Sequence, residues 1–177
     1  MKNYFELTTQ EQEIFKLNQF DSTKNLTGIT AHFIFEGKPI KSKINSVIDC
    51  IYDTYDILKS SIEYVDGVPY RKIGNKYKHS IIFKNNTSEL KKHLNALSVE
   101  PINILDHLCR IDGIIIGDDK YGIIINMHHI IGDAYSIYLI GDIFKKLYDS
   151  QLNNEAIQEI KKESNFNNNI MQSLSYE

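Results

Sequence analysis

The 177-residue sequence lacks tryptophan and holds only two cysteines and three prolines. Cys50 and Cys109 stand in apolar surroundings without CxxC spacing, which indicates buried structural thiols, since a zinc site needs more soft ligands. The longest apolar runs, Ile114–Ile116 and Ile123–Ile125, are far too short to span a bilayer. The first residues carry no apolar segment typical of a signal peptide. These absences predict a cytoplasmic protein that does not enter a membrane.

A clustered positive surface is missing as well, because the formal net charge is −3 and the basic residues are scattered. Two pairs of adjacent lysines come closest to a basic run, Lys145-Lys146 and Lys161-Lys162. Both pairs lie in stretches typical of solvated helix faces. Binding of nucleic acid needs clustered cations that neutralise phosphates, so no nucleic-acid partner is expected. The composition is 42% hydrophobic and 24% charged, as in a folded protein, and the length predicts a single domain over residues 1–177.

Hydrophobic patterning predicts a mixture of strands and helices. Runs rich in β-branched and aromatic residues predict strands at Ile29–Phe35, Ile57–Val65, Val68–Ile73, His79–Lys84, Leu108–Gly117 and Tyr121–His128. Apolar residues at helical spacing predict helices after Thr9, over Ile44–Tyr55, after Asn86 and after Asp133, with a weaker pattern in Asn154–Ser175. In the first helix, Thr9 is expected to cap the amide of Gln12, whose side chain reaches back.

Two turns predict how these strands pair. Asp66-Gly67 favours a tight hairpin, and Asp118–Lys120 joins the last two strands into a second hairpin. The strand Tyr121–His128 is apolar on both faces, which predicts a central position with cover on both sides. We therefore expect an α/β fold, a two-layer sandwich in which helices cover a mixed, largely antiparallel sheet.

Two adjacent histidines, His128 and His129, end the predicted central strand. Successive strand side chains point to opposite faces, which disfavours a metal site built from both histidines and Asp133. A second alternative is a pair of core histidines with ordinary hydrogen bonds. The turn at Gly132 and the following aspartate favour catalysis instead, because an imidazole can accept a proton at neutral pH and return it. Asp133 can cap the next helix and pair with a basic side chain behind the site.

Four segments resemble motifs of the condensation domains of nonribosomal peptide synthetases, in the order of that family. Within the wider chloramphenicol-acetyltransferase-like superfamily, Ile125–Ser136 resembles LxxxxHHIIxDGxS, which contains the HHxxxDG motif. Leu7–Gln10 resembles the N-terminal LSxxQ segment, with Glu11 where the glutamine would stand. Leu58–Ile62 with Asp66–Pro69 resembles LRTxF…DGxPxQ, and Leu108–Arg110 resembles the LxR before the motif. The resemblance covers almost the whole chain and implies a chloramphenicol-acetyltransferase-like lobe.

The resemblance implies a role for each matching residue. His129 corresponds to the catalytic histidine, a general base or positioning group for the attacking nucleophile, and His128 to a structural one. Asp133 matches the aspartate of a structural ion pair, and Lys59 and Arg110 stand at two basic positions of the family.

Three neighbouring residues, Gly132, Ala134 and Ser136, are candidates for positions close to the substrate. Two departures from the family pattern bear on activity. Ala134 replaces the motif glycine, which costs on the order of 1 kcal/mol if that position needs a positive φ and nothing if it is the first helical residue. Lys59 replaces an arginine and loses its bidentate geometry.

The reaction implied is attack of a carrier-bound acceptor amine on a carrier-bound donor thioester. The expected partners are a C-terminal condensation lobe, peptidyl or aminoacyl carrier domains, and an adenylation domain of the same synthetase. Phosphopantetheine is expected on the carriers, with no cofactor bound directly by this chain. We expect the sequence to be the N-terminal half of a condensation domain, cut from a longer synthetase and inactive alone. The alternatives are an epimerisation domain, a stand-alone CoA-dependent acyltransferase, and a non-catalytic module that docks carriers.

Overall fold

The computed structural model describes residues 3–20, 25–150 and 158. The helices of this part of the chain are α1 (Thr9–Phe20), α2 (Lys41–Thr54), α3 (Thr87–Val99), α4 (Ala134–Asp149) and the short 3-10 helix η1 (Asp56–Lys59). The strands are β1 (Tyr4–Glu6), β2 (Gly28–Glu36), β3 (Ser60–Val65), β4 (Val68–Ile73), β5 (Ile81–Lys84), β6 (Cys109–Ile116) and β7 (Lys120–His128). The helical pattern predicted in Asn154–Ser175 lies, apart from residue 158, outside the described residues.

The strands form two sheets, a larger one of order β2-β7-β6-β5 and a smaller one of order β1-β4-β3. In the larger sheet β5 runs parallel to β6, whereas β7 pairs antiparallel with both of its neighbours. The smaller sheet is antiparallel throughout. The expected α/β class, with a mixed and largely antiparallel sheet, is therefore confirmed.

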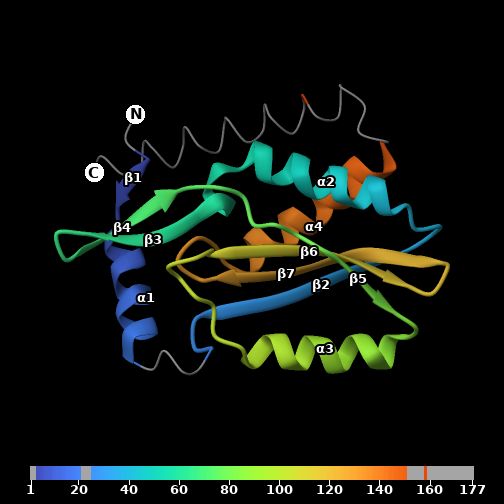
Figure 1. Cartoon of the computed structure of the whole chain (residues 1–177), viewed down its shortest axis with the longest axis horizontal. Coiled ribbons are helices and arrows are strands. Elements are labelled where there is room, and N and C mark those ends of the chain that lie inside the picture. The colour runs from blue at the N-terminus through green and yellow to red at the C-terminus, as the bar shows by residue number, and fades with distance from the viewer. Residues whose placement is uncertain (1–2, 21–24, 151–157, 159–177) are drawn as a thin grey trace.

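Helices cover both faces of the larger sheet, with α2 and α4 on one side and α3 on the other (Figure 1). The side chains of β7 alternate between these faces: Ile123, Ile125 and Met127 join the core under α2 and α4, and Ile124 joins the core over α3. Burial on both faces accounts for the continuous apolar run of this strand. The prediction that it is central and covered on both sides is confirmed.

The smaller sheet packs with α1 around a second core. This core contains the buried side chains of Leu7, Phe15, Ile62, Ile104, Leu108 and Ile130. Ile130 is 4% exposed and belongs to the turn after β7, so the turn is tied to α1 and the smaller sheet by apolar packing. In the predicted hairpin of β3 and β4, Asp66 and Gly67 have φ values of 52° and 81°, as a tight two-residue turn requires.

Two local predictions are wrong. The capping box of α1 lies one residue earlier than expected: the Glu11 amide donates to Thr8 Oγ1 and the Thr8 amide to Glu11 Oε2, whereas the Gln12 side chain donates to the Leu7 carbonyl. Glutamate at this position can close the capping box as glutamine does, because its carboxylate accepts a hydrogen bond from the Thr8 amide. The strand predicted from Ile57 begins only at Ser60, because residues 56–59 form η1.

In the part of the chain that the structure describes, no helix is long and apolar enough to cross a membrane.

Candidate active site at the end of β7

Backbone hydrogen bonds fix the end of β7 from both sides. The His128 amide donates to the Leu108 carbonyl at 2.8 Å, and the His129 amide donates to the Thr27 carbonyl at 2.8 Å. The chain then turns, and the Ile131 amide donates back to the His128 carbonyl at 3.2 Å. The two histidines therefore sit on a backbone held by the segments before β2 and β6 and by the turn itself.

The ring of His128 is buried and uses both of its nitrogens. Only 1% of the residue is exposed, and its Nδ1 accepts a hydrogen bond from the Ile130 amide at 3.2 Å. A nitrogen that accepts carries no proton, so the proton of the neutral ring lies on Nε2. Nε2 is 2.7 Å from Thr27 Oγ1 and 3.2 Å from Asn18 Oδ1. The ring is thus held in one tautomer and one orientation.

The surroundings of His128 favour its neutral form. Burial, and then the neighbouring His129 ring, lower the pKa of His128 from 6.5 to about 4. A proton on Nδ1 would also oppose the Ile130 amide that points at it. The ring of His128 is therefore uncharged at neutral pH.

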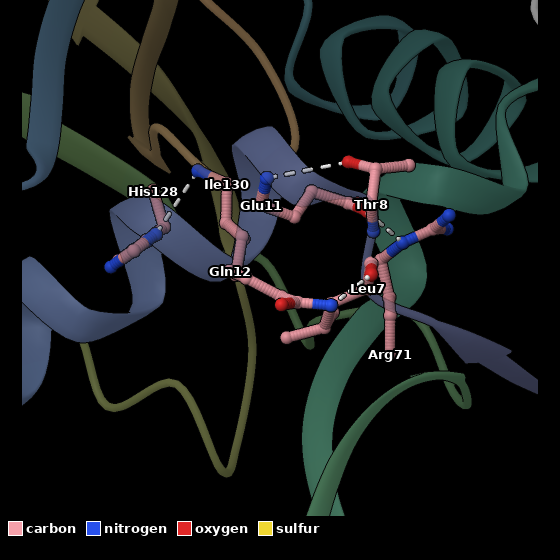
Figure 2. A network of polar contacts seen from close by, with 7 residues as sticks. All are labelled: Leu7, Thr8, Glu11, Gln12, Arg71, His128 and Ile130. Atoms are coloured by element: carbon pink, nitrogen blue, oxygen red, sulfur yellow. Dashed lines mark hydrogen bonds and ion pairs between the residues drawn. The ribbon is translucent and has the colours of Figure 1, made fainter. Parts of the chain in front are cut away.

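Helix α1 brings Asn18 to this ring. Glu11, Phe15 and Asn18 follow at helical spacing and share one face of α1. Glu11 forms an ion pair with Arg71 of β4 at 3.0 Å, and Phe15 is buried in the second core. Figure 2 shows this anchored start of α1 beside the bond from Ile130 to His128. With two turns of α1 fixed, Asn18 lies within hydrogen-bond distance of His128 and of Thr27.

In contrast to His128, His129 is exposed. Its imidazole forms no hydrogen bond or ion pair within residues 3–20 and 25–150, while its backbone is held by Thr27. An exposed imidazole on a fixed backbone is suited to exchange a proton with a bound molecule.

Asp133 caps helix α4. Its Oδ1 accepts from the Ser136 amide and hydroxyl, each at 2.8 Å, and its own amide donates to Ser136 Oγ at 3.3 Å. These bonds from Ser136 hold the pKa of the Asp133 carboxyl below its ordinary value. The predicted cap is confirmed, and Ser136 is occupied by the same capping box. Ala134 is the first helical residue, the position at which its β-carbon carries no penalty.

The turn at Gly132 is tightly packed. A β-carbon at this position would lie 2.8 Å from Met127 Sδ and 3.0 Å from the β-carbon of Ser136. The absence of a side chain therefore allows the turn to fold back onto β7 and the first turn of α4.

The two basic candidates contact residues other than Asp133. Lys59 forms an ion pair with Asp56 at 2.6 Å in η1, and Arg110 lies on β6 opposite Asn126 with its guanidinium 6.0 Å from the Tyr77 ring centre. Neither forms an ion pair with Asp133, so the ion pair implied by the resemblance is not formed between the described residues.

A metal site is not supported by the geometry. No group of three or more histidine, cysteine, aspartate or glutamate side chains in the described residues is arranged to hold a metal ion. His128 also uses both ring nitrogens for hydrogen bonds within the protein.

Sequence reasoning missed Thr27 and Asn18. They are 101 and 110 residues away from His128 in the chain, and neither of them is a motif residue. Only the pairing of β2 with β7 and the packing of α1 bring them to the ring, so no local sequence signal identifies them.

Several synthetases are similar to this chain in sequence. Tyrocidine synthase 2 of Brevibacillus parabrevis is 24% identical over 149 residues, which cover 84% of this chain and 4% of the synthetase. Surfactin synthase subunit 1 of Bacillus subtilis (strain 168) is 22% identical over 148 residues, 83% of this chain and 4% of that protein. The chain thus spans only a small part of the length of these relatives.

Solved structures share the fold, and a family model matches nearly the full sequence. The starter condensation domain of rhizomide synthetase RzmA superposes with a TM-score of 0.77 at 17% identity, over 85% of this chain and 38% of that one. Tallysomycin biosynthesis protein TlmII superposes with a TM-score of 0.74 at 11% identity, over 85% and 38% of the two chains. The model of the condensation domain matches residues 2–176, so this chain belongs to the condensation-domain family.

Proposed function

We propose that the chain is the N-terminal lobe of a nonribosomal peptide synthetase condensation domain that joins two carrier-bound substrates through an amide bond. In this proposal His129 serves as general base or positioning group for the acceptor amine. The observation that carries it is the division between the two histidines: His128 is buried with both nitrogens bonded, and His129 is exposed on a fixed backbone.

The reaction forms one bond and breaks one. The acceptor amine attacks the carbonyl carbon of the donor thioester, a C–N bond forms, and the C–S bond breaks to release the thiol of the donor's phosphopantetheine arm. The amine nitrogen loses a proton as it becomes an amide. An imidazole at the position of His129 can take that proton or orient the amine toward the carbonyl, and either role depends on a fixed ring position.

The other candidate residues support this ring without moving protons. His128 holds the turn through the Ile130 amide, Asp133 caps α4, and Gly132 allows the close return of the chain. Both thioesters are substrates that arrive on partner carrier domains. The complementary C-terminal lobe, the carriers and an adenylation domain are the partners of the proposal.

The test uses the parent synthetase with loaded donor and acceptor carriers and product analysis by mass spectrometry. His129→Ala is expected to lower the rate of amide formation by roughly 10²- to 10⁴-fold, the range of general acid–base catalysis. His32→Ala, which removes another exposed imidazole from β2, is the matched control and should leave the rate unchanged. Full activity of the His129→Ala protein would contradict the assigned role.

The product identifies the reaction class. A dipeptide supports condensation, whereas an inverted stereocentre without a new amide supports epimerisation. Acylation of a free acceptor from a CoA thioester supports a stand-alone acyltransferase. Carrier binding without any turnover, also in the full-length protein, supports a docking module.

A further inference from the structure

Thr27 contacts both histidines of the motif. Its side-chain Oγ1 lies 2.7 Å from His128 Nε2, and its carbonyl accepts the His129 amide at 2.8 Å. The residue is 5% exposed and directly precedes β2, whose Gly28 is paired with His128. One buried residue therefore fixes the ring of the first histidine and the backbone of the second.

The hydrogen bonds around Thr27 have a defined direction. Because His128 Nδ1 accepts from the Ile130 amide, Nε2 carries the proton and donates. Thr27 Oγ1 accepts a hydrogen bond from Nε2–H and donates its own hydroxyl hydrogen in a bond of 3.2 Å to Asn18 Oδ1. The amide oxygen of Asn18 ends the chain as an acceptor. Each donor in the series from Ile130 to Asn18 thus has an acceptor only while His128 keeps the Nε2–H tautomer.

We propose that Thr27 is a positioning residue for the reaction of this domain: its hydroxyl fixes the tautomer of His128, and its carbonyl fixes the backbone of His129. The proposal rests on the proposed function of His129. Without the hydroxyl, the Nε2–H group keeps only Asn18 Oδ1, at 3.2 Å, as an acceptor. The Nδ1–H tautomer then competes, and it removes the acceptor of the Ile130 amide that closes the turn.

The test replaces the hydroxyl and keeps the shape. Thr27→Val removes the acceptor, and Thr27→Ser retains it. The matched control is Thr30→Val, which makes the same change three residues further on β2, at a buried hydroxyl without a hydrogen-bond partner among the described residues. Asn18→Ala is a second, milder variant at a half-buried helix position, so the test does not depend on the folding of the Thr27→Val protein.

Two measurements read the effect. Nitrogen-15 NMR of the histidine-labelled chain is expected to show a single Nε2–H tautomer of His128 in the unaltered protein, in Thr27→Ser and in Thr30→Val. In Thr27→Val, and to a smaller extent in Asn18→Ala, a mixture of tautomers and about tenfold faster hydrogen exchange of the His129 and Ile130 amides are expected. In the parent synthetase, Thr27→Val should lower kcat by roughly 10- to 100-fold with little change in KM, and Thr27→Ser should restore it.

The outcomes separate this proposal from the function on which it rests. If Thr27→Val leaves the His128 tautomer and kcat unchanged while His129→Ala lowers turnover as expected, the role of Thr27 is refuted and the role of His129 stands. A shifted tautomer with unchanged kcat, while His129→Ala lowers turnover as expected, refutes the positioning role as well. If His129→Ala keeps full turnover, the proposed function fails, even where the NMR spectra show that Thr27 sets the tautomer of His128.

Discussion

The buried ring of His128 is expected to make the folded chain sensitive to mild acid. In the unfolded chain the imidazole is hydrated and titrates at its ordinary pKa of 6.5, whereas burial lowers the pKa of His128 in the folded chain to about 4. Between these two values the unfolded state binds a proton that the folded state does not bind. The stability associated with the neutral ring is therefore complete above the unfolded pKa and is lost as the pH falls toward the folded pKa.

The magnitude follows from the two pKa values. Proton linkage between 6.5 and about 4 lowers the free energy of unfolding by about 2 kcal/mol at about pH 5 and by about 3 kcal/mol at about pH 4, relative to neutral pH. Such a loss is a large fraction of the 5–15 kcal/mol or so that stabilises a typical domain. At about pH 5 most carboxylates are still ionised, so this loss precedes their protonation.

The assay compares the unaltered chain with His128→Asn. Asparagine can place an acceptor oxygen near the position of Nδ1, but it does not titrate, and the other histidines remain in both proteins. Guanidinium unfolding at about pH 7, 6 and 5 should give a free-energy difference between the two proteins that shrinks by about 2 kcal/mol as the pH falls. If both curves fall in parallel, or if NMR shows His128 titrating near its ordinary pKa, the reasoning about burial is refuted.

Three further changes probe the turn and the helix that follow β7. Ile130→Ala should lower the free energy of unfolding by about 2–5 kcal/mol in denaturant titrations, because it empties a buried position of the second core. Gly132→Ala should cost about 1–3 kcal/mol in the same titrations, because its β-carbon would meet Met127 Sδ at 2.8 Å; an unchanged midpoint would contradict this contact. Asp133→Ala should lower the free energy of unfolding by about 1 kcal/mol, because the hydrogen bond from the Ser136 amide is lost. Asp133→Asn keeps a side-chain oxygen that accepts this bond, so thermal unfolding should show only a small loss of stability.

Local signals in the sequence predicted much of the fold. Asp66-Gly67 predicted a hairpin because these residue types adopt a positive φ, and both do so in the structure. The apolar character of both faces of Tyr121–His128 predicted the central strand, which lies between β2 and β6. Asp133 predicted the start of α4 because a carboxylate at this position can cap a helix, and in the structure it accepts a hydrogen bond from the Ser136 amide. In each case the stabilising interaction lies within a few residues of the chain or comes from the burial of a single strand.

The parts that sequence could not supply depend on contacts between distant segments. The tautomer of His128 depends on Thr27 and Asn18, which are more than 100 residues away and match no motif. The family segment that contains Lys59 did not predict its ion-pair partner, which is Asp56 of η1. A motif specifies residue types and their order, whereas side-chain partners are set by register and packing.

The structure accounts for one of the two departures from the family pattern, Ala134. Ala134 begins α4, its side chain is exposed, and Asp66 is the one non-glycine residue with positive φ in the described chain, so the backbone at Ala134 makes no demand for glycine. Lys59 contributes to an ion pair within η1. Neither residue belongs to the hydrogen bonds that hold His129, which run through Thr27, His128 and the turn. Neither substitution therefore disturbs the hydrogen bonds at the end of β7, and measured turnover decides between the proposed catalytic lobe and a non-catalytic docking module.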